Sequence, residues 1–515
     1  MVNGENIFLT GNAGTGKSFL VEAYNEYCEE NGIKLLKAAP TGVAACNIKG
    51  VTLHRLFKLK TDVKSMLEEV KSLPPEVESK LNLCSAILID EVSMIRIDVF
   101  DKIMQIIEFV NKKRRDKKRK PIQLILVGDF YQLPPVIPSD DKETLDLYFG
   151  CDIGNGFAFQ SKYWQSLNIQ LEKLTEVRRQ DGDKAFCTAL DKCKEGDIDC
   201  LPFFATETAK EPDEDAIWVV GKNATALEKN EEKLAKIEGQ EYSFTSVYEG
   251  DASKKDGLCE DRFVCKVGAK VIMLVNDPTG LYQNGTMGTI KSVQNEEITV
   301  DIDRTDGTGK DCKPLSVTVK RHEFCKYDYI EKEVTIIEKD ERGEEVTRKY
   351  MELVLSEIGK VKQFPMKLGF AITIHKAQGQ TYDKMNFMPE SIFQDGQLYV
   401  ALSRCRFADK LYIASPLNPR MVRTSQEVVN YYKNPDEYSF FGAENDVISV
   451  QTFRECEGAV KLLTNTFGNH KAEILDFLQA LEKRDKREKE NQQIKEKKKK
   501  KEEIPDDGQL SLLLA

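Results

Sequence analysis

A glycine-rich stretch near the start of the chain has the residue types that hold the phosphates of a nucleotide. The apolar residues 7–9 lead into GNAGTGKS, residues 11–18, and a helical pattern follows. Glycines in a loop between a strand and a helix let backbone N–H groups face phosphate oxygens, and the helix start adds its positive dipole end. We therefore predict an ATP site. Its candidate residues are Gly11, Gly14, Thr15, Gly16, Lys17 and Ser18.

Two side chains of this loop have separate predicted tasks. Lys17 has the charge and the length to reach the β- and γ-phosphates, and Ser18 offers a hydroxyl ligand to Mg²⁺. A chance glycine loop is the alternative. It is disfavoured because every position of the motif is filled in the required strand–loop–helix context.

Paired acids follow a second apolar strand in SAILIDEVSM, residues 85–94. Ligands of open α/β sheets bind at the C-terminal ends of the strands, which is where both acids lie. Asp90 is predicted to hold Mg²⁺, and Glu91 to orient or deprotonate the attacking water. A strand that ends in solvated acids is the alternative, and the nearby phosphate loop makes it the weaker one.

A third apolar strand, in IQLILVGDFYQLPPV at residues 122–136, leads to Gln132. Its neutral amide can hydrogen-bond both a γ-phosphate and a water, so it can sense whether the phosphate is present. Strands that end in polar residues in this way require a parallel α/β sheet, which gathers those ends at one edge.

The composition of the whole chain fits a globular protein of about three domains. The chain has 515 residues, of which 41% are hydrophobic and 31% charged, and ~150 residues per domain is the usual prior. No apolar run approaches the ~20 residues that span a bilayer, and no signal peptide is recognisable, so we expect a cytoplasmic location and no membrane partner. The 13 cysteines lack a C-x-x-C pair, which favours reduced thiols over a metal cluster.

The motifs occur in the order of a known enzyme family. In sequence they read GNAGTGKS, APTGVAA, TLHRLF, IDEVSM, VGDFYQLPPV, EVRRQ, FAITIHKAQGQTYD and YVALSRCR. The set resembles superfamily-1 helicases of the 5′→3′ subclass, most closely the petite-integration-frequency (PIF) family, over about residues 4–435. The resemblance implies an α/β fold with two RecA-like P-loop motor domains and ATP in the cleft between them. Alternating apolar and polar residues with turns between them in 266–362 predict a small inserted β-barrel.

The resemblance also implies roles for residues of the second motor domain. Arg179 and Arg404 match two arginines that neutralise the γ-phosphate in the transition state. Arginines that arrive from the opposite domain work only when the cleft is closed, which couples hydrolysis to domain movement. Gln378 and Gly379 match a segment that contacts the nucleotide and relays the state of the cleft.

The residues that match DNA contacts of the family are divided between the two motor domains. Small hydroxyls and backbone N–H groups suit a motor that must grip any sequence by its phosphates. For His54 and His375, ordinary packing is the alternative. The full set is Pro40, Thr41, Gly42, Thr52, His54, Thr373 and His375.

One departure from the family pattern concerns the nucleotide base. The family usually carries a glutamine upstream of the phosphate loop, where it reads the adenine edge. Only ten residues precede Gly11 here, and none of them is glutamine. Either adenine is read otherwise or the start of the chain is missing, so the base preference is left open.

The same reading gives an order of domains along the chain. Residues 1–175 are predicted to form the first motor domain. Within it, residues 57–83 are either a strand-separating wedge, as in the family, or a plain helical connection, and the basic residues 111–121 read as a solvated loop. The remaining segments are the second motor domain at 176–265 and 363–435, the β-barrel at 266–362, helices at 436–481, a charged tether at 482–505 and a terminal peptide at 506–515.

The last residues, GQLSLLLA, resemble the short peptide by which bacterial replication and repair proteins dock on the sliding clamp. A glutamine would hydrogen-bond the pocket rim, and leucines would fill an apolar pocket, each contributing ~1.5–3 kcal/mol if fully buried. A frayed amphipathic end is the alternative. The candidate contact residues are Gln509, Leu510, Leu512 and Leu514.

These features predict an ATP- and Mg²⁺-dependent DNA helicase that moves 5′→3′ on single-stranded DNA, unwinds tailed duplexes and acts as a monomer in replication, repair or recombination. One alternative is a DNA-stimulated ATPase that does not unwind. Another is a nucleotide-switched clamp on single strands, which the complete set of hydrolysis residues disfavours. An RNA substrate is also compatible, because phosphate-gripping motifs say little about the 2′-hydroxyl.

Overall fold

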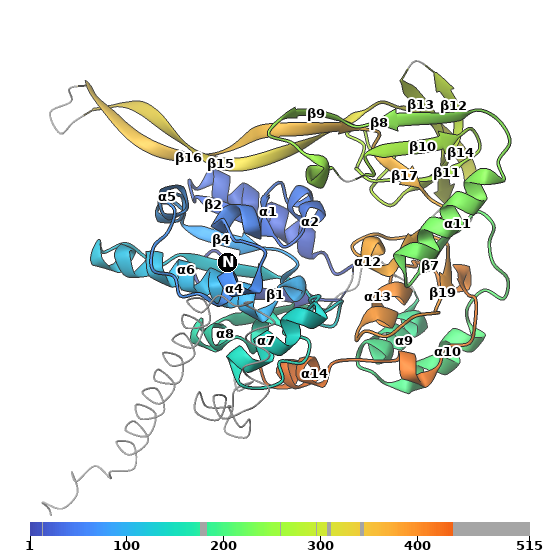
Figure 1. Cartoon of the computed structure of the whole chain (residues 1–515), viewed down its shortest axis with the longest axis horizontal. Coiled ribbons are helices and arrows are strands. Elements are labelled where there is room, and N and C mark those ends of the chain that lie inside the picture. Colours follow the sequence, from blue (N-terminus) through green and yellow to red (C-terminus); the bar gives the residue numbers. More distant parts are fainter. Residues whose placement is uncertain are drawn as a thin grey trace, which may run out of the picture.

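The computed structural model describes residues 1–435 apart from positions 13, 176–182, 258, 295, 306–310 and 340–344. Arg179 and all segments after residue 435 therefore lie outside the described residues. Figure 1 shows two α/β domains side by side and a β-rich insertion above the second. No helix of the described part is long and apolar enough to cross a bilayer.

The first domain is built around a six-stranded parallel sheet in the order β3-β2-β4-β5-β1-β6. The strands β1, β4 and β5 are buried along their whole length, as expected for central strands covered on both faces. The bounds are β1 Ile7–Gly11, β2 Leu35–Ala39, β3 Val51–Thr52, β4 Ala86–Ile89, β5 Gln123–Val127 and β6 Gln170–Leu174.

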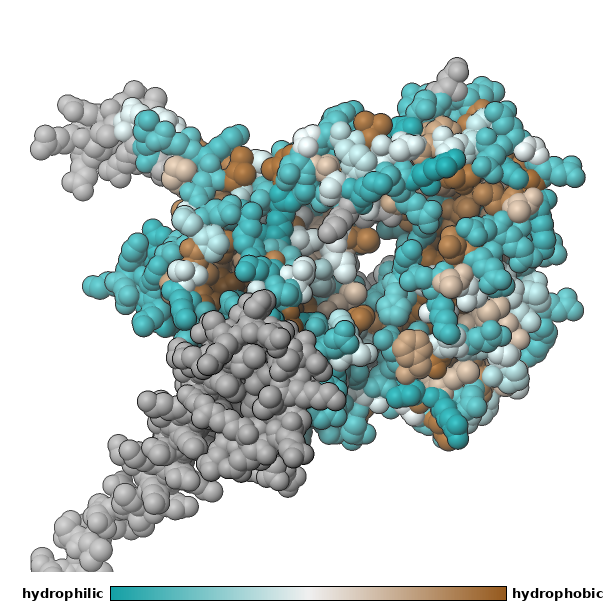
Figure 2. Space-filling model, in the orientation of Figure 1, coloured by the Kyte–Doolittle hydropathy of each residue, from teal (hydrophilic) through white to brown (hydrophobic). Residues whose placement is uncertain are grey.

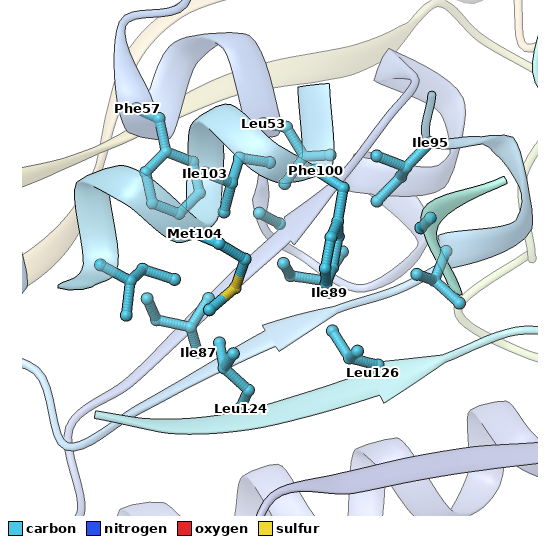
Figure 3. Close-up of a cluster of buried hydrophobic side chains, with 14 of the residues drawn as sticks. Leu53, Phe57, Ile87, Ile89, Ile95, Phe100, Ile103, Met104, Leu124 and Leu126 are labelled. Atoms are coloured by element: carbon cyan, nitrogen blue, oxygen red, sulfur yellow. The ribbon is translucent and has the colours of Figure 1, made fainter. Parts of the chain in front are cut away.

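Helix α6, Ile97–Asp116, covers one face of this sheet. Its buried residues recur at helical spacing, and Figure 3 shows Phe100, Ile103 and Met104 packed over strand residues such as Ile89 and Leu126. This stripe forms the core of the first domain. The other helices here are α1 Lys17–Glu30, α2 Gly42–Asn47, α3 Leu53–Phe57, α4 Val63–Leu67, α5 Pro75–Leu83, α7 Ser139–Phe149 and α8 Lys162–Ser166.

The start of the basic segment 111–121, predicted as a solvated loop, instead forms the last turns of α6. The reason is Arg114, which is buried and donates to the carbonyls of Leu81, Asn82 and Cys84. A guanidinium has several N–H donors in a fixed geometry, so it can hydrogen-bond several backbone carbonyls at once. Composition alone marked this arginine as solvated.

Short helices occupy the segment between α3 and β4, where a wedge was considered. Val63, Met66 and Leu67 of α4 are buried, as are Val77 and Leu81 of α5. Both helices pack against α6. This packing fits the plain helical connection, and the wedge remains a prediction.

Helix α14, Gln426–Lys433, returns the chain to the first domain. Tyr431 is buried in its aromatic cluster, with its ring centroid 5.8 Å from Phe130 and 4.6 Å from Phe159. Trp164 Nε1 donates a hydrogen bond of 3.2 Å to the Tyr431 hydroxyl. The first domain is therefore completed by residues that follow the second domain in the chain.

The second domain has a four-stranded parallel sheet in the order β18-β7-β19-β20. A separate apolar core lies between this sheet and the helices α9 and α13. Its strands are β7 Ile217–Val220, β18 Ala371–Thr373, β19 Met385–Met388 and β20 Leu411–Ile413. Its helices are α9 Lys184–Lys194, α10 Leu201–Thr206, α11 Asn223–Ala235, α12 Ile374–Ala377 and α13 Gln397–Leu402.

The predicted β-rich insertion lies between α11 and β18. A five-stranded antiparallel sheet, β14-β13-β12-β11-β17, shares one apolar core with the pair β10-β8, giving a barrel-like module. The strands are β8 Glu241–Thr245, β9 Val247–Gly250, β10 Arg262–Lys266, β11 Lys270–Met273, β12 Met287–Gln294, β13 Glu297–Thr305, β14 Asp311–Val319 and β17 Met366–Leu368.

Two strands of the insertion, β15 His322–Lys339 and β16 Glu345–Gln363, form a long antiparallel ribbon that crosses to the first domain. Tyr329 is buried in the first core, and its hydroxyl accepts a 2.7 Å hydrogen bond from the Lys37 backbone N–H. Lys80 Nζ lies 3.0 Å from the Asp328 carboxylate. The ribbon thus attaches the barrel-like module to the first domain.

Candidate active site

The phosphate loop leaves β1 at Gly11 and enters α1 at Lys17, as predicted. Gly14 and Gly16 have φ angles of 82° and 91°, a left-handed conformation that glycine adopts without strain. Position 11 requires glycine for a steric reason, because a Cβ there would lie 2.6 Å from the Leu174 carbonyl oxygen. Lys17 Nζ donates to the carbonyl oxygens of Gly11 at 2.6 Å and Asn12 at 3.1 Å. The ammonium is thus held at the mouth of the loop.

The two acids follow β4 directly and point to the same edge of the sheet as the loop. The backbone N–H of Glu91 donates to the Asp90 carboxylate at 2.9 Å. Glu91 has a φ of 51°, and a non-glycine residue held there costs roughly 1–3 kcal/mol, a type of strain that clusters at functional sites. Sequence reasoning found the residue and missed its backbone strain.

The electrostatics of this pair suit a divalent cation. Burial raises the pKa of Asp90, and burial together with the charge of Asp90 raises the pKa of Glu91 to about 7. The charges of Lys17 and Arg404 offset this effect only in part, and a hard cation with oxygen ligands would supply further positive charge. The Gln378 Oε1 atom is also buried and lacks a hydrogen-bond partner in the described part of the chain. The donor set therefore fits Mg²⁺, with Ser18 and Asp90 as the candidate ligands.

Gln132 and Gln378 join the two domains by a hydrogen bond. Gln378 Nε2, from the second domain, lies 3.3 Å from Gln132 Oε1 and 3.4 Å from Glu91 Oε2. Gln132 Nε2 is held by the buried Asp129 carboxylate at 3.3 Å. Sequence reasoning assigned no role to Asp129, which orients Gln132. The three predicted residues are brought together, and the contact joins the two domains.

Arg404 lies at the end of α13 and is almost fully buried, with 1% of its surface exposed. Its guanidinium donates to the Val400 carbonyl at 2.8 Å and to the Ser403 hydroxyl at 2.8 Å. Burial lowers its pKa, while the charges of Tyr399 and Glu91 oppose that effect. The arginine is therefore anchored in the second domain and lies close enough to Glu91 of the first to interact with its charge. Gly379, beside Gln378, has a φ of 79°.

The predicted DNA-contact residues lie at the starts of short helices. The hydroxyls of Thr41, Thr52 and Thr373 accept hydrogen bonds from backbone N–H groups and cap α2, α3 and α12. Each helix start therefore places a threonine beside the backbone N–H groups of its first turn. Pro40 and Gly42 flank the first of these caps.

The two histidines share a pKa lowered by burial and differ in the exposure of the residue. Burial lowers the pKa of His54, so it is neutral near pH 7 and retains one N–H donor. His375 is exposed, which argues against core packing for that residue. In the space-filling view an opening lies near the centre of the molecule, with α2 and α12 on opposite sides of it (Figures 1 and 2).

The fold and the site define a P-loop ATPase with two RecA-like domains, in which one domain carries the phosphate loop and acids and the other contributes Arg404 and Gln378. The family model described as PIF1-like helicase matches residues 1–199. The ATP-dependent DNA helicase Pif1 of Bdellovibrio bacteriovorus is 30% identical over 443 residues, covering 84% of this chain and 89% of the relative. The chain belongs to the PIF1-like helicase family.

Further relatives and solved structures agree with this assignment. The ATP-dependent DNA helicase Pif1 of Campylobacter jejuni is 29% identical, covering 83% of this chain and 94% of the relative. The crystal structure of Bacteroides sp Pif1 in complex with ADP-AlF4 has 26% identity and a TM-score of 0.69, covering 84% of this chain and 93% of that one. The crystal structure of Bacteroides Pif1 bound to ssDNA has a TM-score of 0.54, and the match covers 84% of this chain and 94% of that one. The structure as a whole is therefore more similar to the former.

Proposed function

We propose that this ATP-dependent DNA helicase translocates 5′→3′ on single-stranded DNA by opening and closing the cleft between its two RecA-like domains. One observation carries the mechanism: Gln378 of the second domain is hydrogen-bonded to Glu91 and Gln132 of the first. The residues expected to handle the attacking water are thus in direct contact with the opposite domain. A change in the phosphate can therefore be transmitted to the domain arrangement.

The residues at the first domain's edge would carry out the ATP chemistry. Lys17 would leave the loop carbonyls that it now contacts and bind the β- and γ-phosphates, while Ser18 and Asp90 would hold Mg²⁺. The cation supplies charge neutralisation on the phosphates. Glu91, oriented by its strained backbone, would accept the proton of the attacking water, and Gln132 would position that water.

Closure of the cleft would then complete the site. Arg404 and Arg179 would neutralise charge on the γ-phosphate, each from the second domain. Arg404 is already buried near the acids, which supports a short path to the nucleotide. After hydrolysis this attraction is lost and the cleft reopens.

The residues that hold the DNA phosphates would form two sites, called grips, one on each side of the same cleft. The capped helix starts of α2 and α3 belong to the first domain and that of α12 to the second. When the cleft closes, one grip would approach the other along the strand, giving a step for each ATP. Neither grip reads bases, which suits a motor that works on any sequence.

Direction of movement distinguishes this proposal from the alternatives. We expect duplexes with a 5′ single-stranded tail to be unwound in the presence of ATP and Mg²⁺, and 3′-tailed duplexes of the same sequence to remain intact. Strand separation can be followed by fluorescence on both tail types and on DNA–RNA hybrids. Unwinding of the 3′-tailed substrate alone would refute the direction. DNA-stimulated hydrolysis without any strand separation would favour the ATPase or clamp alternatives.

We further propose that one copy suffices for unwinding. Two RecA-like domains in one chain already supply the phosphate loop and the opposing arginines. The rate of single-turnover unwinding should then be independent of helicase concentration once all substrate is bound.

The terminal peptide, which lies outside the described residues, is proposed to dock on a bacterial sliding clamp. A peptide of residues 500–515 should bind the clamp with a dissociation constant in the micromolar range, because ordering a flexible segment offsets part of the leucine burial. Fluorescence anisotropy with labelled peptide measures this. A peptide with Gln509→Ala and Leu512→Ala should bind at least ~10-fold more weakly. Equal binding of both peptides would refute the docking mode.

A further inference from the structure

Helix α9 of the second domain reaches the phosphate loop of the first. Asn12 Nδ2 donates to the Asp191 carboxylate at 2.8 Å, and Lys194 Nζ donates to Asn12 Oδ1 at 2.9 Å. Lys194 Nζ also lies 3.1 Å from the Asp191 oxygen. Both ends of one amide are therefore engaged from the opposite domain, which fixes the side chain of a residue inside the phosphate loop.

Lys194 is buried, so its ammonium depends on the partners that it contacts. Only 5% of its side chain is exposed, and an ammonium at such a site is tolerated only with hydrogen-bonding or charged partners. Those partners are Asn12 and Asp191. The ammonium also lies 5.3 Å from the ring centroid of Tyr131, within reach of a cation–π contact. Tyr131 directly precedes Gln132, so Lys194 touches two loops of the ATP site.

Asn12 also contacts the ammonium of Lys17 within the phosphate loop. The Asn12 backbone carbonyl accepts hydrogen bonds from Lys17 Nζ at 3.1 Å and from the Thr15 hydroxyl at 2.9 Å. A displacement of the Asn12 side chain would therefore move an acceptor that positions Lys17. The contact with α9 and the phosphate-binding side of the loop share this one residue.

The contact also lies at the connection between the two domains. The Thr424 hydroxyl donates to the Lys194 backbone carbonyl at 2.6 Å, and Thr424 precedes α14, which returns the chain to the first domain. Tyr432 of α14 stacks on Tyr131, with ring centroids 4.9 Å apart, and its hydroxyl hydrogen-bonds the Thr10 side chain at 2.9 Å. Rotation of one domain against the other therefore acts on Lys194 and on the strand that carries the loop.

We propose that Lys194 and Asp191 position the phosphate loop through Asn12 and thereby set the affinity for ATP according to the arrangement of the second domain. Lys194 is a positioning residue, since it acts through Asn12 rather than on the nucleotide. The inference rests on the proposed ATP site. Because coupling between two events is reciprocal, nucleotide bound at the loop would in turn favour the domain arrangement in which the contact forms.

The test measures the affinity of the full chain for a fluorescent, non-hydrolysable ATP analogue with Mg²⁺. Lys194→Met, which keeps the length but removes the charge, should raise the dissociation constant at least ~10-fold, because a hydrogen bond to a charged group is lost. Lys194→Arg should stay within about threefold of wild type, since a guanidinium can donate to both partners. Lys184→Met, which removes an exposed charge from the same helix, should have no effect.

Two further measurements separate positioning from other roles. With saturating ATP and single-stranded DNA, Lys194→Met should retain kcat within about threefold, so that the change appears in KM. In a double-mutant cycle, Asn12→Ala should weaken binding by itself and abolish the further effect of Lys194→Met. If Lys194→Met fails to fold, Asn12→Ala alone should still show the weaker binding.

An unchanged dissociation constant in Lys194→Met, or full additivity with Asn12→Ala, would overturn the inference. A fall in kcat with unchanged KM would also overturn it, because that result would place Lys194 in closure of the cleft. Failure of the wild-type chain to bind the analogue would instead refute the ATP site itself, so the two outcomes are distinct.

Discussion

Arg404→Ala is expected to bind ATP with nearly wild-type affinity and to hydrolyse it at least ~10³-fold more slowly, the range found when an arginine that neutralises transition-state charge is removed. The guanidinium is buried next to the charge of Glu91 and belongs to the opposite domain. Its main contribution should therefore come when the cleft is closed and charge grows on the γ-phosphate. Arg179→Ala should behave in the same way.

Burial of Arg404 makes a control necessary. The side chain also satisfies the carbonyls of Val400 and Gln380, so its removal affects packing as well as chemistry. Single-turnover hydrolysis and analogue binding should be measured on the same preparation, with Arg404→Lys as the variant that keeps charge but loses the planar fork. Equal losses in binding and turnover, together with a lower melting temperature, would indicate a structural role only.

Lys17→Ala should abolish detectable ATP hydrolysis and unwinding while leaving the affinity for single-stranded DNA close to wild type. Its ammonium donates hydrogen bonds to carbonyls of the phosphate loop, and the residues predicted to contact DNA lie on other elements. ATPase assays and anisotropy with a labelled oligonucleotide measure the two properties separately.

A charge-matched control is available for this variant. Lys71→Ala removes an exposed lysine from the same domain and should change neither property. Normal turnover in Lys17→Ala would show that the phosphate site has been misassigned. Loss of DNA binding together with hydrolysis would show that the loop is needed for more than nucleotide chemistry.

The phosphate loop and the acids could be predicted because their chemistry is local. Glycines, a lysine and a hydroxyl follow one another within eight residues, and a strand that ends in two acids needs only its neighbour in the sheet. The α/β fold followed from the same strands. Gln132 could be recognised for the same reason, since its amide lies at the end of a third strand.

The features that sequence reasoning missed depend on residues far apart in the chain. Lys194 contacts Asn12 across 182 residues, and Tyr329 bonds the Lys37 backbone across 292. Alternating apolar residues predicted the strands of the ribbon. The surface on which the ribbon packs depends on tertiary contacts. An alternation with a period of two residues shows which face of a strand is buried, but not which part of the molecule covers it. Arg114 was misread because its burial depends on carbonyls of another helix.

The return of α14 to the first domain determines the order in which the chain can fold during synthesis. Trp164 and its partner Tyr431 are separated by 267 residues, so at ~5–20 residues per second a ribosome needs on the order of 10–50 s to deliver the second after the first. During this interval Phe130, Phe159 and Trp164 lack the ring that covers them. The first domain therefore cannot complete its core as an independent nascent unit, and a fragment that stops before residue 426 presents an aromatic surface to chaperones or to other copies of itself.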